Sequence, residues 1–210
     1  MLPSTRMSAT DRKQQLLETA LDLFSRKGFE GTTTKELACA AGVAEAVIFR
    51  HFSSKQALYT AALDYKVHNG EAKNWLTETR ACMERDDDEG LFRTIASRVL
   101  RSYRTDPRFE RMVLFAALEG HEVALAYVRE QSFPLVQLLD EYIARRQAQG
   151  ALLGLRPVYV LSAIFGMAHH YAQASQMFRV IPDPPPDEEV VNAFVRILMN
   201  GIRPPEAKKQ

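Results

Sequence analysis

Residues 28–58, GFEGTTTKELACAAGVAEAVIFRHFSSKQAL, decide how this chain folds. Thr33 followed by Glu36 is the capping-box pattern, in which each side chain satisfies a free backbone N–H at the start of a helix. Gly42 suits the left-handed residue that ends this short helix. A second short helix is expected from Ala44 to His51. Two short helices joined by a glycine turn predict a helix-turn-helix, which lays its second helix in the major groove of DNA.

The segments on either side complete a three-helix unit. Before it, Asp11 to Lys27 has the apolar spacing of an amphipathic helix and is expected to cover the helix-turn-helix. After it, Ser53 with Gln56 repeats the capping-box pattern and is expected to start the next helix. The pattern alone leaves open an ordinary three-helix bundle with no role in DNA binding.

Several side chains have a physical reason to contact DNA. Lys55 stands near the start of a helix, where the positive end of the helix dipole disfavours a cation. A lysine at this place is favourable if it and the helix end both face a phosphate. An exposed Val47 would suit a thymine methyl group, and Glu45 could accept a hydrogen bond from cytosine N4. Arg50 and His51 also belong to the second short helix, Ala44 to His51. Each of them could instead be a solvated or packed surface residue.

The same stretch resembles the N-terminal domain of TetR-type transcriptional regulators over roughly residues 10–65. The resemblance rests on Phe24, Gly28, Phe29, Thr33, Leu37, Ala38, Ala41, Gly42, Val43, Phe49, His51, Phe52, Lys55 and Leu58. It implies an all-α homodimer whose C-terminal domain binds a small molecule or partner and so releases DNA. It also implies phosphate contacts by Thr33, Thr34, Phe49, His51 and Lys55, and contacts to base edges or the groove wall by Lys35, Glu45, Ala46, Val47 and Arg50.

Three positions depart from the family pattern. Ala44 replaces the usual Ser or Thr cap of the recognition helix, which should cost about 1 kcal/mol of local stability. Ala46 stands where Gly or Pro is often found, at little cost. Phe49 replaces a common Tyr and therefore lacks the hydroxyl that would bond a phosphate. The phosphate contacts should thus depend more on Lys55, Arg50 and the backbone.

Composition agrees with a selective DNA-binding protein. The chain has 210 residues, 46% of them hydrophobic, and a formal net charge of +1. Residues 1–65 hold eight basic and seven acidic residues, whereas a nonspecific polyanion binder would be far more basic. Cys39 and Cys82 offer neither metal spacing nor a disulfide framework. The N-terminus lacks a secretory signal, and the longest apolar run, Val158 to Ala168, is too short to span a bilayer. A cytoplasmic protein is expected.

The fold class expected is all-α, with about nine helices. An N-terminal helix-turn-helix domain, 1–52, precedes a larger effector-binding and dimerisation domain, 53–210. The helix from Ser53 should connect the two and continue toward Arg85 through Gly70, and the tail after Pro204 should be disordered. Two late helices, Arg156–Phe178 and Glu188–Met199, resemble the family's dimerisation helices, although they could instead close a monomeric core.

The middle helices are expected to enclose a cavity for a small apolar or aromatic effector. Each candidate could equally be an ordinary core residue. The candidates are Trp75, Tyr103, Met112, Phe115, His121, Tyr127, Phe133, Phe165 and His169.

An enzyme is not expected. His121 and Glu122 begin an apparent zinc-protease motif, but Leu125 occupies the position that needs histidine. His169 and His170 are adjacent and face different sides of a helix, so no metal site and no cofactor are predicted. The predicted function is a repressor that binds a palindromic operator as a homodimer and is released by an effector. The alternative is a helical sensor or interaction protein without specific DNA binding.

Overall fold

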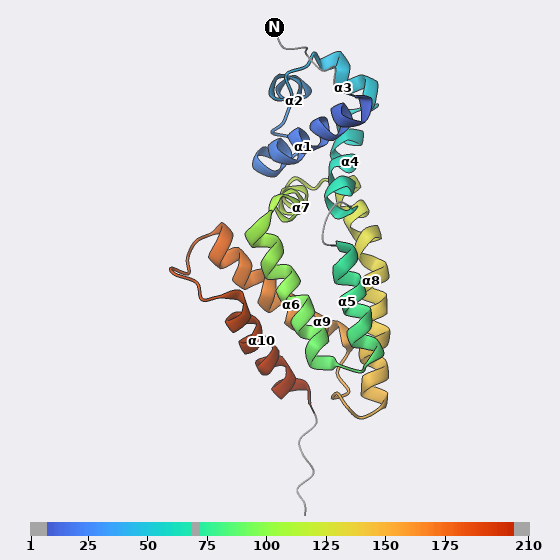
Figure 1. Cartoon of the computed structure of the whole chain (residues 1–210), viewed down its shortest axis with the longest axis vertical. Coiled ribbons are helices and arrows are strands. Elements are labelled where there is room, and N and C mark those ends of the chain that lie inside the picture. The colour runs from blue at the N-terminus through green and yellow to red at the C-terminus, as the bar shows by residue number, and fades with distance from the viewer. Residues whose placement is uncertain (1–7, 69–71, 204–210) are drawn as a thin grey trace, which may run out of the picture. The chain divides into compact units, whose positions relative to one another are not determined.

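The computed structural model describes residues 8–68 and 72–203, and the regular elements in these ranges are all helical, as the sequence predicts (Figure 1). Within them lie ten α-helices and one π-helical segment, η1. Their bounds are α1 Ala9–Lys27, α2 Thr34–Ala40, α3 Glu45–His51, α4 Lys55–His68, α5 Ala72–Glu84, α6 Asp88–Thr105, α7 Arg108–Glu119, α8 Glu122–Ala148, α9 Pro157–Ala172, η1 Gln173–Met177 and α10 Asp187–Ile202.

The chain divides into two compact units that do not follow the predicted boundary after residue 52. Unit 1 comprises Met1–Ala72 and Pro107–Gln131, and unit 2 comprises Lys73–Asp106 and Ser132–Gln210. Helices α4 and α7 therefore belong with the helix-turn-helix, and α8 contributes its first part to unit 1 and the rest to unit 2. A division made along the sequence cannot show that a later helix returns to an earlier core.

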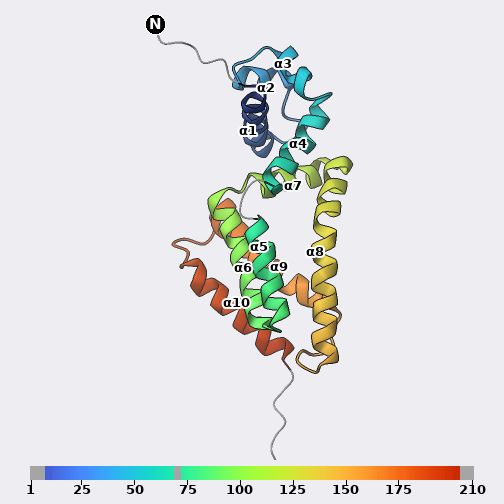
Figure 2. The same cartoon turned by 45° about the vertical axis from the view of Figure 1, so that its right-hand side comes forward.

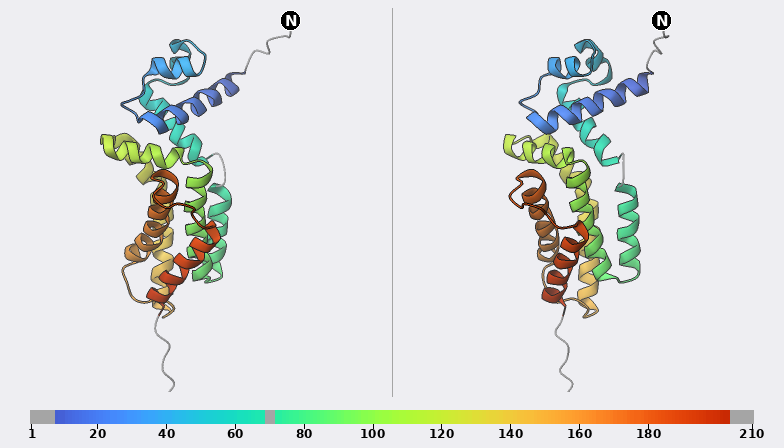
Figure 3. Two further views of the ribbon diagram at one scale, coloured as in Figure 1. Left: turned by 90° about the vertical axis from the view of Figure 1, so that its left-hand side faces the viewer. Right: turned by 60° about the vertical axis from the view of Figure 1, so that its left-hand side comes forward.

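Unit 1 is built around α1, which packs against α2, α4 and α7 (Figure 3). The amphipathic face of α1 buries Leu21 and Phe24 completely. Tyr59 of α4 and Met112 of α7 lie in the same core with no exposed surface. The Tyr59 hydroxyl donates a hydrogen bond to the Met112 carbonyl oxygen at 3.0 Å, which joins α4 to α7.

Unit 2 is built around α6, which packs against α9 and α10 (Figure 2). Ile95 of α6 and Ile164 of α9 are fully buried, and Val195 of α10 is nearly so. Helix α5 adds Met83 to this core, and the second part of α8 adds Ile143. The predicted helices Arg156–Phe178 and Glu188–Met199 correspond to α9 with η1 and to α10.

The helix that follows the helix-turn-helix begins one residue later than its predicted cap implies. The predicted capping box of Ser53 and Gln56 is wrong by one residue, because α4 begins at Lys55 and the Ser54 hydroxyl accepts from the Ala57 N–H at 3.0 Å. Whether the helix continues through Gly70 lies outside the described residues, since α4 ends at His68 and α5 begins at Ala72. The predicted disorder after Pro204 also lies outside them. Among the described helices, none is long and apolar enough to cross a membrane.

Candidate DNA-binding site

The first turn of α2 contains the predicted capping box. The Thr33 hydroxyl accepts from the Glu36 N–H at 3.1 Å, and the Glu36 carboxylate accepts from the Thr33 N–H at 2.9 Å. Lys27 of α1 donates to the same carboxylate at 2.8 Å. This lysine bond, followed by the bonds from Thr33, lowers the pKa of Glu36 from 4.5 to about 2. Three donors therefore hold the start of α2 in place, next to the predicted phosphate contacts.

Glu36→Gln should lower the melting temperature modestly at neutral pH, and the effect should vanish in acid. A carboxylate whose pKa is depressed on folding stabilises the fold above its unfolded pKa, and loses that contribution as pH falls through its folded pKa. The difference from wild type should therefore shrink between pH 4.5 and about 2. Thermal melts across this range would measure it. Glu30→Gln, which changes an exposed carboxylate in the loop before α2, is the control, and an equal response of both variants would contradict the prediction.

The turn between α2 and α3 has the predicted glycine geometry. Gly42 adopts a φ of +65°, and the N–H of Val43 bonds back to the Ala38 carbonyl at 3.0 Å. Helix α3 then begins after Ala44, which offers no side-chain cap, as the sequence predicts. On the inner face of α3 Ile48 is fully buried, and Phe52, which directly follows the helix, is nearly so. The recognition helix is thus held by its inner face, and its outer face is left free.

The predicted DNA-contacting residues gather on the surfaces of α2, α3 and the start of α4. Thr34 and Glu45 meet, because the Thr34 hydroxyl donates to the Glu45 carboxylate. The His51 ring lies near Phe52, with ring centres 6.4 Å apart. Six of the ten predicted contact residues are exposed, namely Thr33, Lys35, Glu45, Ala46, Phe49 and Arg50. The other four are half-buried, namely Thr34, Val47, His51 and Lys55.

Lys55 has an aromatic partner, Phe29, that no local sequence pattern indicates. Its ammonium nitrogen lies 4.1 Å from the ring centre of Phe29, which is a cation–π contact. Phe29 in turn packs against Phe24, Tyr59 and His121 in unit 1. An aromatic ring therefore fixes the position of the Lys55 ammonium group at the start of α4.

The structure divides the nine predicted effector-pocket residues between the two units. Met112 is fully buried and Tyr103 is 3% exposed, whereas Phe133 is 66% exposed. In unit 2 the Tyr103 hydroxyl lies 3.3 Å from His169 Nδ1 and accepts from Gln173 at 3.2 Å. Unit 1 holds Met112, Phe115, His121 and Tyr127, and unit 2 holds Trp75, Tyr103, Phe133, Phe165 and His169.

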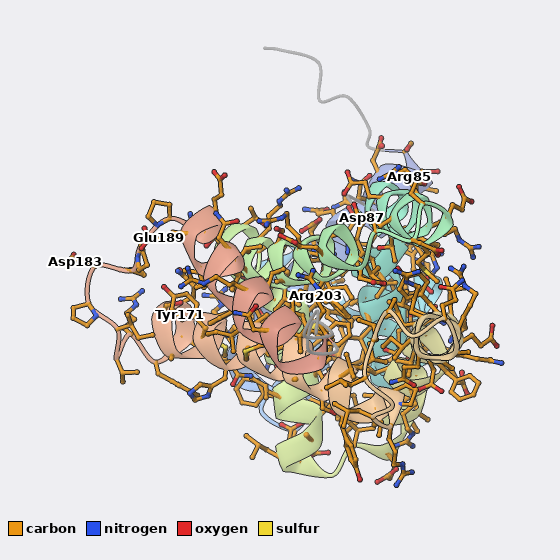
Figure 4. All side chains as sticks on the ribbon, turned by 90° about the horizontal axis from the view of Figure 1, so that it is seen from below. Arg85, Asp87, Tyr171, Asp183, Glu189 and Arg203 are labelled. Atoms are coloured by element: carbon orange, nitrogen blue, oxygen red, sulfur yellow. The ribbon has the colours of Figure 1, made fainter. Side chains whose placement is uncertain are left out.

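A hollow of about 550 Å³ in unit 2 is bordered by other residues, and none of the nine candidates lines it. Figure 4 labels Asp87 at the start of α6 and Arg203 just after α10, two residues on its border. Its floor contains an ion-pair network in which Arg146 contacts Asp88 and Asp86 at 2.8 and 3.2 Å. Three of the bordering charged residues, Asp86, Asp88 and Arg146, are thus already paired with one another. Over residues 8–68 and 72–203, no group of three or more His, Cys, Asp or Glu side chains is placed to hold a metal ion.

An exposed recognition helix anchored by a buried inner face, preceded by a capped helix and a glycine turn, defines a helix-turn-helix DNA-binding protein. The family model described as bacterial regulatory proteins, tetR family, matches residues 16–62. The chain is 30% identical to the HTH-type transcriptional regulator RutR of Escherichia coli (strain K12) over 201 residues, 92% of this chain and 91% of the relative. It therefore belongs to the TetR family and is a DNA-binding transcriptional regulator.

The chain is also similar to another transcriptional regulator in sequence and to two solved regulators in structure. The HTH-type transcriptional repressor AcnR of Corynebacterium glutamicum is 31% identical over 103 residues, covering 48% of this chain and 55% of the relative. The crystal structure of AibR in complex with isovaleryl coenzyme A and operator DNA has a TM-score of 0.67 at 22% identity, covering 90% of this chain and 98% of that one. The structure of the fatty acid degradation regulator FadR from Bacillus halodurans has a TM-score of 0.65 at 17% identity, and the match covers 94% of this chain and 98% of that one. These two structures share its fold.

Proposed function

We propose that this regulator is a repressor that binds a palindromic operator as a homodimer and leaves it when a small effector binds. The observation that carries the proposal is the outer face of α3, where Glu45, Ala46, Phe49 and Arg50 are exposed while Ile48 anchors the helix. Arg50 would contact the base edges or a phosphate, and Phe49, which is 47% exposed, would pack against the groove wall. Because the proposed target is DNA, we expect the protein to act in the cytoplasm.

The partner in the dimer would be a second copy that covers the outer faces of α9 and α10. Tyr159 of α9 and Ile197 of α10 are 58% and 60% exposed, respectively, while the opposite faces of both helices are buried in unit 2. Gly166 of α9 has no atom within 4 Å of where a Cβ would stand, so another helix could approach closely there. A two-fold dimer would present two recognition helices to the two halves of a palindrome.

The effector would be uncharged, and apolar or aromatic. Support comes from unit 2, where Phe165 stacks near His169 and the Tyr103 hydroxyl faces the same imidazole. Burial lowers the pKa of His169, so its neutral form predominates at neutral pH. Polar but uncharged groups beside aromatic rings suit a planar ligand with few charges. AibR was crystallised in complex with isovaleryl coenzyme A and operator DNA, so at least one protein of this fold binds a small molecule, although that ligand carries charged phosphates, unlike the effector proposed for this chain.

Lys55→Ala should weaken operator binding about tenfold and reduce its salt dependence. Each lysine that neutralises a phosphate releases a counterion, so losing one should lower the slope of log K against log salt by about one per subunit. Fluorescence anisotropy at several salt concentrations would measure both quantities, using DNA enriched from a random-site selection. Lys66→Ala, in the last turn of the same helix, is the matched control.

Two outcomes would contradict the proposal. If selection enriched no palindrome, the protein would be a sensor without specific DNA binding. If Lys55→Ala and Lys66→Ala behaved alike, the phosphate contact assigned to Lys55 would be wrong, although the regulator itself would stand.

A further inference from the structure

The corner between α7 and α8 is tightly built. Glu119 is the last residue of α7, and Gly120 follows in the left-handed conformation with a φ of +63°. The N–H of His121 bonds back to the Ala116 carbonyl at 2.8 Å. His121 Nδ1 then accepts from the Ala124 N–H at 3.1 Å and caps the start of α8. The backbone at Glu119 is thus held by α7 on one side and by the capped start of α8 on the other.

The Glu119 carboxylate binds the loop between α1 and α2. One oxygen, Oε2, accepts from the Phe29 N–H at 3.0 Å, and the other, Oε1, accepts from the Glu30 N–H at 3.2 Å. An ionised carboxylate makes such bonds about twice as strong as a neutral acceptor does. Gly28 permits the approach, because a Cβ there would stand 2.1 Å from Oε1. A residue 89 positions further along the chain therefore holds this loop.

The loop leads directly into the DNA-contacting end of α2. The hydroxyl of Thr32, which is fully buried, donates to the Gly28 carbonyl at 2.8 Å, and the N–H of Thr32 bonds to the Phe29 carbonyl at 3.3 Å. Thr33 follows as the cap of α2. With residues 28–32 fixed in this way, the position of the Phe29 and Glu30 backbone sets where Thr33 and the first turn of α2 lie.

Through Phe29, the Glu119 carboxylate also affects the position of Lys55, the second predicted phosphate contact. The Phe29 backbone is bonded to Glu119, and the Phe29 ring lies 4.1 Å from the Lys55 ammonium nitrogen. The ring also meets His121, with centres 4.3 Å apart, so it is confined by the α7–α8 corner. Moving the Phe29 backbone would move the ring and with it the preferred place of the Lys55 cation.

We infer that Glu119 is a positioning residue for DNA binding, which acts through the α1–α2 loop on the start of α2 and on Lys55. It touches no DNA itself. The inference rests on the proposed function, since it assumes that Thr33, Thr34 and Lys55 contact phosphates. It adds a route by which a shift of the α7–α8 corner would alter both sets of contacts at once.

Glu119→Gln is the sharpest test because it keeps the size of the side chain and removes one acceptor. In the observed geometry each carboxylate oxygen accepts from one N–H group, so the amide NH₂ of glutamine would face one of those two N–H groups as a second donor. The sign of the effect is informative. Removing a negative charge from a protein that binds a polyanion should strengthen binding if the residue is a bystander. A positioning role predicts weaker binding in spite of the lost charge.

Arg111→Lys is the matched control. Arg111 of α7 donates from Nε to the Ser25 carbonyl at 2.8 Å, so it also joins α7 to α1, but at a residue within α1 rather than in the α1–α2 loop. The lysine keeps the charge. Both substitutions should lower the melting temperature, because each removes a hydrogen bond that joins α7 to α1 or to the α1–α2 loop.

The experiment measures Kd by anisotropy on the selected operator at several salt concentrations, well below each melting temperature. We expect Glu119→Gln to weaken binding about tenfold and to lower the salt slope by about one per subunit, as for a lost phosphate contact. Arg111→Lys should keep both within twofold of wild type.

Three results would overturn the inference. If Glu119→Gln binds as tightly as wild type or more tightly, Glu119 is only a structural link. If both variants lose affinity equally with unchanged salt slopes, the effect is general destabilisation of unit 1. If the wild-type protein enriches no operator, the proposed function fails and the inference fails with it, and this result is distinct from the first two.

Discussion

Gly28→Ala is expected to lower the free energy of unfolding by about 2–4 kcal/mol. Gly28 has φ +74° and ψ −177°, a combination that is almost restricted to glycine and costs a residue with a side chain about 1–3 kcal/mol. The added Cβ would also stand 2.1 Å from Oε1 of Glu119 and 2.9 Å from the ring of Phe115. Strain and collision act together, because the α1–α2 loop and α7 meet at this residue.

Gly42→Ala separates the two causes of that loss. Gly42 also has a positive φ, +65°, but nothing lies within 4 Å of its Cβ position. It should therefore show only the strain of a left-handed residue, about 1–2 kcal/mol. Urea denaturation of both variants would give the comparison. If Gly28→Ala cost no more than Gly42→Ala, the close approach of Glu119 would not matter energetically.

Asp88→Asn is expected to destabilise unit 2 by about 2–4 kcal/mol. Asp88 is 9% exposed and accepts from the Tyr142 hydroxyl at 2.6 Å and from Arg146 at 2.8 and 2.9 Å. Removing one member of a buried ion pair typically costs 3–5 kcal/mol, because the other charge is left without compensation. The loss should be smaller here because Asp86 also contacts Arg146 at 3.2 Å.

Glu89→Gln is the control for Asp88→Asn. Its carboxylate is 56% exposed and pairs with Arg93 at 3.4 Å, so its contribution should be below about 1 kcal/mol. Hydrogen exchange would locate the effect, with faster exchange expected in α6 and in the second part of α8. A loss for Asp88→Asn as small as that for Glu89→Gln would mean that the network contributes little.

Local signals in the sequence predicted the helix-turn-helix well. Thr33 and Glu36 form the capping box, Gly42 takes the left-handed turn, and Ala44 leaves α3 without a side-chain cap. These features were predictable because each depends on residues only a few positions apart. The misplaced cap of α4 shows the limit of such signals, since two adjacent serines offer the same chemistry and Ser54, rather than Ser53, provides the cap.

The effector candidates show a different limit. Aromatic and methionine side chains at helical spacing predict a buried face, but they do not reveal whether that face closes a core or lines a cavity. Met112 joins the core of unit 1 and Tyr103 that of unit 2, so two similar patterns ended in different units. Only the path of the chain in space separates them.

By itself the sequence determined the all-α class, the helix-turn-helix and the outward face of the recognition helix, because periodicity, capping and turn chemistry act over a few residues. Tertiary structure decided which distant elements support that site. It brought α7 back to α1, placed the Glu119 carboxylate on the Phe29 and Glu30 amides, and set the Phe29 ring against Lys55. Such contacts join residues 26 to 90 positions apart, and no local pattern encodes them, since they depend on how complete helices pack.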